Sequence, residues 1–304
     1  MKNKLVWASI LLSLSNLSYS QITPKYYDWM SGEVKSAGWD KGYSGQGTQI
    51  VTLDFFTTTD PFYAKLDSYN VNARHGSHVG KVTRLMAPNA TLRYADYSST
   101  TMMSLPIDTS KINIINASFA LYTDENQIKK GQTFGNNLVK SLISNAQNGT
   151  ALVVKAAGNN GINLDEALTS GTYANQEDGL NTSLVTSNSV IYVGALSNFG
   201  TITNKASLAS YSNKAGIDPE FQKRFLVTGV RSYKIGVGGT SFAAPIVSSY
   251  ASILGSKFKT ATPTKIANQL LNTARTDTIL NYDPSLHGKG EVSLTRAIAP
   301  ISLK

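Results

Sequence analysis

A serine, a histidine and an aspartate in this chain could together form an activated nucleophile. Asp54 ends the apolar run at 50–53, and Ser241 follows the glycine pair at 238–239. A serine hydroxyl is a weak nucleophile near neutral pH, so it needs a base within hydrogen-bond reach, and that base needs a carboxylate to orient it. The sequence offers three histidines as the base: His75, His78 and His287. These residue types predict acyl transfer through serine, provided that the fold gathers them.

Ser241 lies between a glycine-rich turn and an apolar stretch that is expected to form a helix. Pro245 falls in the first turn of that helix, where the early N–H groups lack intrahelical partners and proline is tolerated. A serine at this point lies near backbone N–H groups and the positive end of the helix dipole, which stabilise a developing anion. The alternative is a helix N-cap, a common role of serine.

Asp54 and Asn159 also have alternatives. Asp60 could replace Asp54, but Asp60 precedes a proline in a polar segment and no apolar run leads into it. Asn159 belongs to an Asn-Asn-Gly sequence that is typical of a turn, so it could be a turn former. A role beside the nucleophile remains open for Asn159, because its amide group could donate to an anion.

Other kinds of site fit the sequence less well. His75 and His78 have the spacing of a metal pair, but no third ligand follows at a recognised spacing, so we predict no metal site. The glycine pair is not followed by the Gly-Lys-Ser/Thr of a nucleotide-binding loop. An α/β-hydrolase would place its serine first within Gly-x-Ser-x-Gly, whereas here the serine comes last and Ala243 stands where the final glycine would be.

Short apolar runs alternate with amphipathic stretches along the chain, which predicts a doubly wound, mainly parallel α/β sheet in a single domain. A helix is expected over Asn136–Gln147, and a long surface loop over 161–189. Two helices are expected in the tail from Thr262, the first capped by Thr262 or Thr264 and the last over Val292–Ile298. Functional groups of such sheets gather beyond the carboxyl ends of the strands. The expected strands are Gln49–Asp54, Thr91–Asp96, Ile112–Ala117, Ala151–Ala156, Val190–Ala195 and Arg224–Val227.

Five segments resemble motifs of the subtilisin-like serine proteases, and they occur in that family's order between about residues 35 and 300. The resemblance implies the subtilisin-like fold and a serine endopeptidase that needs no cofactor for its chemistry. A structural calcium ion is frequent in the family, but no ligand set can be assigned here. The segments are Ile50–Asp54 (IVTLD), His75–Val79 (HGSHV), Ile115–Ala120 (INASFA), Ala156–Asn159 (AAGN) and Gly239–Pro245 (GTSFAAP).

The resemblance also implies a role for each matching residue. Asp54, His75 and Ser241 correspond to the catalytic triad, and Asn159 corresponds to the side chain that binds the oxyanion. Protein or peptide substrate is expected to bind along these residues: Ser118, Phe119, Ala120, Ala157 and Gly158.

Some positions depart from the family pattern. Phe55 and Phe56 stand where small residues are usual, and they could narrow the cleft or pack against the helix that bears His75. Ala120 replaces a usual glycine, so we expect it, with Phe119 nearby, to limit the size of the substrate side chain before the scissile bond. Gly80-Lys81 replaces a usual Ala-Gly, and the sequence offers no role for Lys81. We see no prosegment, and expect folding either unaided or with a helper or inhibitor that acts in trans.

Residues 1–20 have the features of an export signal, so residues 21–304 are expected to form the catalytic domain of a secreted or periplasmic protein. Lys2 and Lys4 precede an apolar stretch, and small residues precede a cleavage point at Gln21. A membrane anchor is the alternative, but serines and Asn16 interrupt the apolar stretch, which is short for a bilayer. No span is expected after the signal is removed. The absence of cysteine excludes disulfides.

The formal charge of +9 comes from scattered basic residues, so nucleic acid is not an expected partner. A monomer is the default expectation. The second function considered is a catalytically weak protein of this fold that acts as a binding module, which Phe55, Phe56 and Ala120 would favour.

Overall fold

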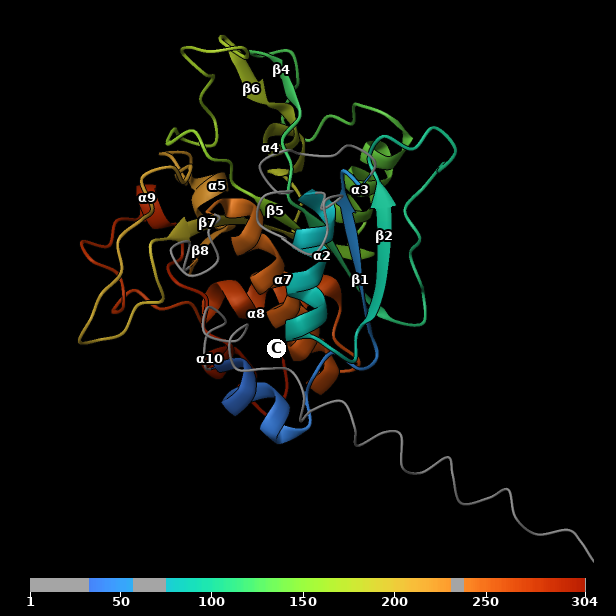
Figure 1. Ribbon diagram of the computed structural model, residues 1–304, viewed down its shortest axis with the longest axis vertical. Coiled ribbons are helices and arrows are strands. Elements are labelled where there is room, and N and C mark those ends of the chain that lie inside the picture. Colours follow the sequence, from blue (N-terminus) through green and yellow to red (C-terminus); the bar gives the residue numbers. More distant parts are fainter. Residues whose placement is uncertain (1–32, 57–74, 231–237, 304) are drawn as a thin grey trace, which may run out of the picture.

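The computed structural model describes residues 33–56, 75–230 and 238–303 (Figure 1). The expected export signal and Asp60 lie outside these ranges. Six parallel strands form the central sheet in the order β2-β1-β3-β5-β7-β8. They are β1 (Thr48–Asp54), β2 (Thr91–Asp96), β3 (Ile112–Ala117), β5 (Ala151–Ala156), β7 (Val190–Leu196) and β8 (Phe225–Gly229).

Every expected strand is present, with ends shifted by at most two residues. In five of the six strands all residues are buried, because helices cover both faces of the sheet. Edge strand β2 is the exception, since residues 93–94 are exposed. The prediction of a doubly wound, mainly parallel α/β sheet is confirmed.

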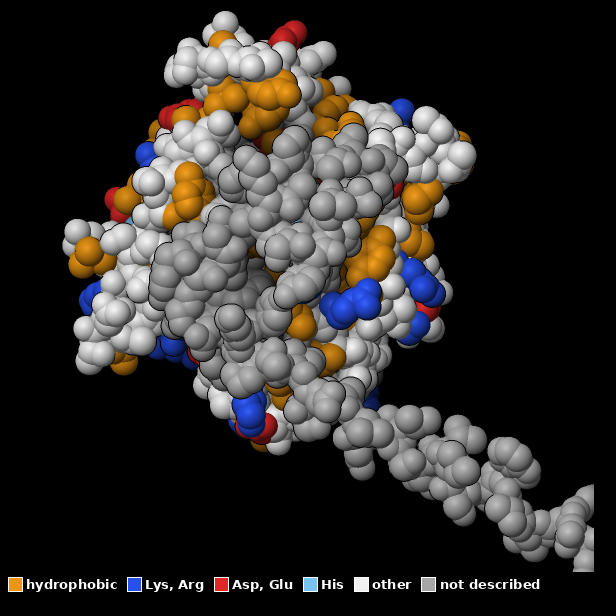
Figure 2. All heavy atoms as spheres, viewed as in Figure 1, with side chains coloured by type: hydrophobic (Ala, Val, Ile, Leu, Met, Phe, Trp, Pro, Cys, Tyr) orange, Lys and Arg blue, Asp and Glu red, His pale blue; other side chains and the backbone are white. Residues whose placement is uncertain are grey.

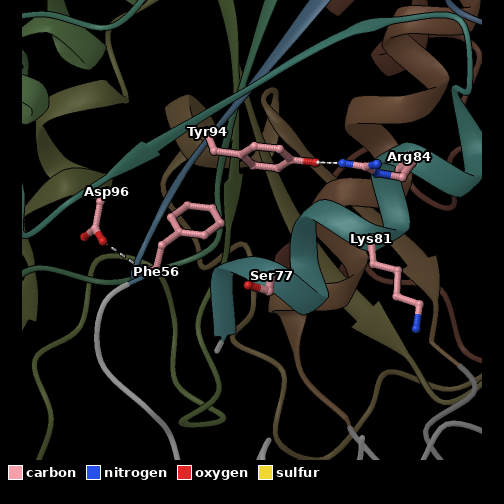
Figure 3. A pocket seen from close by; sticks show the side chains of 6 residues that line it. All are labelled: Phe56, Ser77, Lys81, Arg84, Tyr94 and Asp96. Carbon is pink, nitrogen blue, oxygen red and sulfur yellow. Dashed lines mark hydrogen bonds between the residues drawn. The ribbon is translucent and has the colours of Figure 1, made fainter. Parts of the chain in front are cut away.

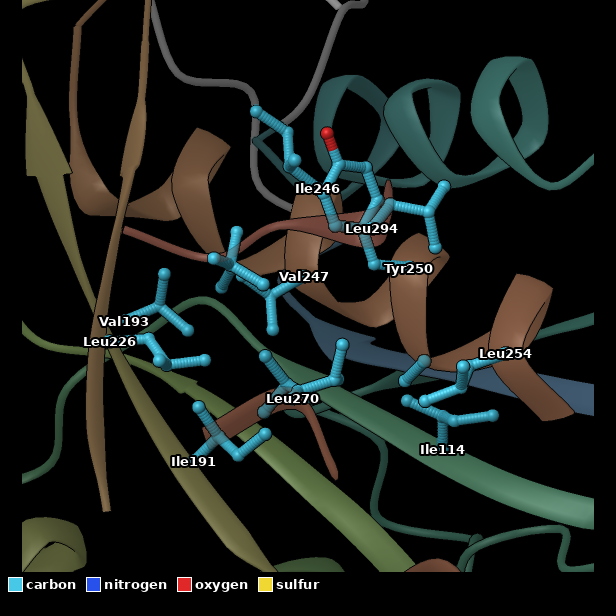
Figure 4. Packing of buried hydrophobic residues seen from close by; sticks show 14 of the residues in the cluster. Ile114, Ile191, Val193, Leu226, Ile246, Val247, Tyr250, Leu254, Leu270 and Leu294 are labelled. Carbon is cyan, nitrogen blue, oxygen red and sulfur yellow. The ribbon is translucent and has the colours of Figure 1, made fainter. Parts of the chain in front are cut away.

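Side chains alternate between two hydrophobic cores, one on each face of the sheet. Ile50 and Ile114 belong to the first core, whereas Val51 and Ile115 belong to the second. The first core lies beneath α2 (His75–Met86), α7 (Thr240–Lys257), α8 (Pro263–Asn272) and α10 (Leu294–Ile298). Figure 4 shows Val247 and Leu270 packed against side chains of the strands in this core. The second core is covered by α3 (Asn137–Gln147) and α4 (Gly179–Leu184), together with α5 (Pro219–Gln222).

The expected loop at 161–189 is in part wrong. It contains β6 (Gln176–Asp178), which pairs antiparallel with β4 (Tyr122–Asp124), and then α4. Asp178 caps α4 by accepting a hydrogen bond from the backbone N–H of Leu180 at 3.2 Å. Leu180 and Leu184 are buried, so packing rather than local composition forms this helix.

The expected bounds of α3 and the expected start of α8 agree with the structure, whereas the tail holds one helix more than expected. Asn136 caps α3 and Thr262 caps α8. A short helix, α9 (Pro284–His287), precedes α10, which begins at Leu294 rather than Val292. Turns Val34–Gly38 (π-helical) and Trp39–Lys41 (3₁₀) come first in the described chain, and the π-helical turn packs near α10.

Within the described residues, no helix combines the length and apolar character that a membrane crossing needs. On the face in Figure 2, Lys and Arg side chains form small separate groups, and hydrophobic side chains gather around the β4–β6 ribbon at the top.

Candidate active site

Asp54 and His75 meet where β1 ends and α2 begins. The Oδ1 of Asp54 lies 2.7 Å from the Nδ1 of His75 and also accepts the backbone N–H of Phe55 at 2.7 Å. Asp54 is 0% exposed, because it is the last residue of a strand that is buried on both faces. The carboxylate therefore fixes both the orientation and the tautomer of the imidazole.

Burial raises the pKa of the Asp54 carboxyl above its ordinary value, and the hydrogen bond and charge of His75 oppose this rise. The N–H of Phe55 also lowers this pKa, whereas the charge of Asp96 raises it. Asp96 lies opposite Asp54 in the β1–β2 register, and its Oδ1 accepts the Ser98 hydroxyl at 2.6 Å. Asp54 is the deeper of the two carboxylates and the one in contact with imidazole.

Ser241 lies in the first turn of α7, the helix that packs against α2 (Figure 1). Gly239 precedes this turn with φ +141°, a conformation that side chains rarely adopt. The hydroxyl of Ser241 donates to the carbonyl oxygen of Ser118 at 3.1 Å, and the hydroxyl of Ser118 donates to the carbonyl oxygen of Ser241 at 3.1 Å. These reciprocal bonds join the start of α7 to the residues that follow β3.

Asn159 is held against the same end of α7. Its Oδ1 accepts the backbone N–H of Thr240 at 2.8 Å and the Thr240 hydroxyl at 3.1 Å. The Thr240 hydroxyl in turn accepts the N–H of Gly158 at 3.0 Å. With its oxygen bound in this way, the Asn159 amide has its nitrogen as the donor for an anion near Ser241.

Asp54, Ser118 and Asn159 lie at or just beyond the carboxyl ends of β1, β3 and β5, which are neighbours in the sheet. The chain leaves β1 toward β2 on one side and later returns to β3 on the other. Such a reversal of strand order opens a crevice at the carboxyl edge, where ligands of doubly wound sheets bind. Asp54 ends β1 and Ser118 follows β3, so the reversal places these two residues at the same edge of the sheet.

Phe119 and Ala120 point to different surroundings. Phe119 is buried against Phe55 and Tyr97, with ring centroids 6.1 and 5.3 Å apart. Ala120 lines a small cavity together with Ala157. Of the two residues, Ala120 is therefore the one that lies at the cavity, and the limit on substrate size stays a prediction.

Of the two unusual aromatic residues, Phe56 packs against α2, as one of the two expectations held, whereas the Phe55 ring packs against Tyr97 and Phe119. A Cβ placed on Gly76 would lie 2.8 Å from the Phe56 ring, so the helix approaches this ring closely. A close approach also accounts for glycine at position 80, where the family usually has alanine, since a Cβ there would lie 2.6 Å from the ring of Tyr94. Sequence reasoning missed Tyr94 because no local pattern relates an edge strand to this helix.

Lys81 lines an open pocket between α2 and β2, and Figure 3 shows it near Arg84, with Asp96 on the opposite side of the pocket. Arg84 donates to the hydroxyl of Tyr94 at 3.1 Å across this pocket. The other two histidines lie elsewhere: His78 is one turn further along α2, and His287 is buried at the end of α9, bonded to the backbone of Asp283. In the described ranges, no group of three His, Cys, Asp or Glu side chains could hold a metal ion.

The chain is similar to known proteins over most of its length. Residues 62–290 match the Subtilase family, a range that begins after Asp54 and includes His75, Asn159 and Ser241. A thermostable alkaline protease from Halalkalibacterium halodurans is 27% identical over 287 residues, covering 85% of this chain and 69% of that protein.

Two solved structures share the fold. The prenylagaramide maturation protease has a TM-score of 0.56 at 20% identity, and the match covers 88% of this chain and 97% of that one. The epidermin leader peptide processing serine protease from Staphylococcus aureus has a TM-score of 0.56 at 18% identity, covering 91% of this chain and 82% of that one. Because the family match spans most of the chain, the protein belongs to the subtilase family of serine peptidases.

Proposed function

We propose that the chain is a secreted serine endopeptidase in which Asp54, His75 and Ser241 form the catalytic triad. The observation that carries this proposal is the 2.7 Å contact between the buried Asp54 carboxylate and the His75 imidazole. His75 begins α2, which packs against α7, and Ser241 lies in the first turn of α7. A buried carboxylate in this position stabilises the imidazolium that forms when histidine takes a proton.

In the proposed reaction, Ser241 turns its hydroxyl from the Ser118 carbonyl toward His75. The Oγ then bonds to the carbonyl carbon of the peptide while the Nε2 of His75 takes the hydroxyl proton. The carbonyl oxygen becomes an oxyanion, which accepts hydrogen bonds from Asn159 Nδ2 and from the backbone N–H of Ser241.

The tetrahedral intermediate then collapses. The carbon–nitrogen bond breaks, and His75 gives its proton to the leaving amine. A water molecule, deprotonated by His75, attacks the acyl carbon. The bond from that carbon to Ser241 Oγ then breaks, Oγ takes the proton from His75, and the acid product leaves. Residues 118–120 would align the substrate as an added strand, with Ala157 and Gly158 on its other side. No cofactor takes part in these steps; structural calcium stays an unassigned hypothesis.

The test is hydrolysis of fluorescent casein by the purified chain and by two matched serine variants. Ser241→Ala should lower turnover by about 10⁶-fold, the loss known for the nucleophile in this family. Ser249→Ala is the control, because Ser249 is buried in the same helix and its hydroxyl donates to the Pro245 carbonyl at 2.7 Å. Equal turnover by Ser241→Ala and the native chain would refute the proposal.

Export and association are part of the same proposal. Cleavage before Gln21 predicts that the secreted chain has Gln21 as its first residue, which N-terminal sequencing would detect. We propose that the exported chain is a monomer and that it refolds unaided. Recovery of activity only when a second polypeptide is added would instead indicate a helper that acts in trans.

The second candidate is a catalytically weak subtilase that binds peptides. The bond from the Ser241 hydroxyl to Ser118 favours it, because that bond directs the hydroxyl to a carbonyl oxygen. This candidate predicts that peptides bind but are not cleaved, and that Ser241→Ala binds them as tightly as the native chain.

A further inference from the structure

An open pocket, which we call the basic pocket, lies between α2 and the edge strand β2. Its volume is about 480 Å³, which falls in the range of sites that admit a small ligand or a side chain. The proposed reaction uses none of the side chains that line it. They are Ser77, Lys81 and Arg84 from α2, Tyr94 and Asp96 from β2, and Phe56 after β1 (Figure 3).

Three side chains of α2 face the basic pocket because of their spacing. Ser77, Lys81 and Arg84 stand at i, i+4 and i+7, which places them on one face of the helix, and all three are exposed. Arg84 pairs with no acidic side chain among the described residues, and its guanidinium donates to the Tyr94 hydroxyl at 3.1 Å. This face therefore supplies two positive charges and several N–H and O–H donors.

Tyr94 and Phe56 form an apolar wall of the basic pocket. Their rings pack edge to face, with centroids 5.5 Å apart and an interplanar angle of 65°. Tyr94 is 40% exposed, so part of its ring faces the pocket. Its hydroxyl accepts a hydrogen bond from Arg84, so the hydroxyl proton is available to donate to a ligand. The wall thus offers a surface for methylene groups, with a further donor at its edge.

Asp96 is the one acid among the described residues that line the basic pocket. Its Oδ1 accepts the backbone N–H of Ser98 at 2.9 Å and the Ser98 hydroxyl at 2.6 Å, and its Oδ2 accepts the N–H of Phe56 at 3.3 Å. Figure 3 shows this carboxylate on the opposite side of the pocket from Lys81 and Arg84. The side at the two cations therefore suits an anion. A guanidinium matches a carboxylate in particular, because it can form two parallel hydrogen bonds with it.

The basic pocket begins next to the proposed triad and extends away from it. Ser77 follows His75 by two residues, in the first turn of α2. A helix rise of about 1.5 Å per residue puts Lys81 about 9 Å and Arg84 about 14 Å beyond His75 along the axis. An extended peptide advances about 3.3 Å per residue, so these distances correspond to about three to four residues of substrate. A substrate side chain at roughly that separation from the scissile bond can therefore reach the two cations.

We propose that the basic pocket is an exosite, a binding site outside the catalytic centre, for an acidic side chain of the substrate about three to five residues from the scissile bond. The carboxylate of a Glu or Asp would accept hydrogen bonds from Arg84 and Lys81, while its methylene groups lie against the Tyr94 ring. This inference rests on the proposed function and adds a substrate class to it: peptides with an acidic residue at a distance from the cleaved bond. It also gives a role to Lys81, for which the sequence offered none.

The test is a panel of quenched fluorescent peptides built on one casein sequence, with Glu or Gln at one position at a time. Glu and Gln have nearly the same size, so each pair isolates the charge. We expect kcat/KM to be about tenfold higher for Glu than for Gln at one or more positions about three to five residues from the cleaved bond. A Glu-over-Gln ratio below about twofold at every position would overturn the proposal.

Variants of the two cations locate the effect. In Arg84→Gln and in Lys81→Gln the Glu-over-Gln ratio should fall to about threefold or less, and in the double variant to about one, while kcat/KM for the Gln peptide changes less than about threefold. Arg93→Gln is the matched control, because Arg93 is exposed on β2 beside Tyr94 but its side chain lies on the other face of the strand. A ratio that persists in the double variant, or that falls equally in Arg93→Gln, would overturn the proposal.

Charge reversal gives a result that a loss of packing cannot imitate. In Arg84→Glu, a peptide with Lys at the preferred position should be cleaved faster than the Glu peptide, the reverse of the native order. Arg93→Glu changes the net charge of the chain by the same amount and should keep the native order. The same order in both reversed variants would overturn the proposal.

Binding to Ser241→Ala separates this proposal from the proposed function. Fluorescence anisotropy with the same peptides reads the basic pocket without chemistry. Binding of a Glu peptide about tenfold tighter than its Gln partner, with the difference lost when Arg84→Gln is added, supports the exosite even if the native chain cleaves nothing. Equal binding of the two peptides overturns it even if the chain is an active peptidase.

Discussion

The Nδ1 of His75 lies 2.7 Å from the Oδ1 of Asp54, and the same oxygen accepts the N–H of Phe55. The backbone therefore holds the carboxylate in place while the carboxylate holds the imidazole. An amide in place of the carboxylate would keep the shape of this contact but would remove its charge, and it could present an N–H to the ring.

Asp54→Asn should therefore lower kcat by about 10⁴-fold with little change in the fold, because the imidazole loses its charge partner and its tautomer. Stopped assays with the casein substrate would measure kcat, and far-UV circular dichroism would show whether the fold is kept. Asp96→Asn is the matched control, since Asp96 lies opposite Asp54 in the sheet and binds Ser98. Similar losses in the two variants would contradict the special role of Asp54.

Asn159→Asp tests the oxyanion donor while keeping the oxygen that Thr240 contacts. It should lower kcat by about 10²–10³-fold or more, the loss known for this donor in the family, with KM nearly unchanged. Asn160→Asp keeps the acceptor for Tyr122 and should lower kcat less than tenfold. Steady-state kinetics on one peptide would measure kcat and KM for both variants. A higher KM with kcat nearly unchanged in Asn159→Asp would indicate that Asn159 binds substrate rather than the oxyanion.

Gly158→Ala should destabilise the chain more than Gly42→Ala does. Both glycines have positive φ, +108° and +82°, which costs a side chain about 1–2 kcal/mol. A Cβ on Gly158 would also lie 2.5 Å from the Nδ2 of Asn213, whereas one on Gly42 would meet nothing within 4 Å. The clash adds about 1–3 kcal/mol to the loss. Urea unfolding would measure both values, and equal losses would show that the structure accommodates the methyl group.

Lys155→Met should lower the free energy of unfolding by about 3–5 kcal/mol, because it leaves the buried Asp178 carboxylate without its cation. Adding Asp178→Asn removes the unpaired charge and should recover part of this loss. A double-mutant cycle from urea unfolding gives the coupling between the two residues. Strictly additive losses would mean that the pair does not interact energetically.

Glu291→Gln should gain stability relative to the native chain as pH rises. Burial raises the pKa of Glu291, although Thr278, the Gly200 N–H and Arg275 oppose this. The folded chain thus holds this proton more tightly than the unfolded chain, so ionisation above about pH 4.5 favours unfolding. The difference in unfolding free energy, variant minus native, should increase between about pH 4 and pH 7.

Asp283→Asn is a control of opposite sign. The hydroxyl and N–H of Ser285 lower the pKa of Asp283, so its ionised form stabilises the fold and that contribution is lost as pH falls. The free energy of unfolding of Asp283→Asn minus that of the native chain should become more negative as pH rises. If the two variants change in the same direction with pH, these pKa directions are wrong.

The sequence predicted the sheet well because its strands are apolar runs buried on both faces, and such runs are visible without tertiary information. Asp54 and Asn159 could be placed near each other because residues after parallel strands share one edge. Helix α4 was missed because its segment is polar and its stability comes from Asp178 and two buried leucines. The ion pair of Lys155 with Asp178 could not be predicted from the sequence, because the two residues lie on different strands and only the fold brings them together.

Labelling with a fluorophosphonate probe, followed by peptide mapping, tests the central claim most directly, because the probe reacts with activated serines whatever the substrate. The account predicts a single adduct, on Ser241, that is absent in Ser241→Ala and forms far more slowly in His75→Ala. A folded native chain that stays unlabelled, or one in which Ser241→Ala labels as fast as the native chain, would contradict the assignment of Ser241 as the nucleophile.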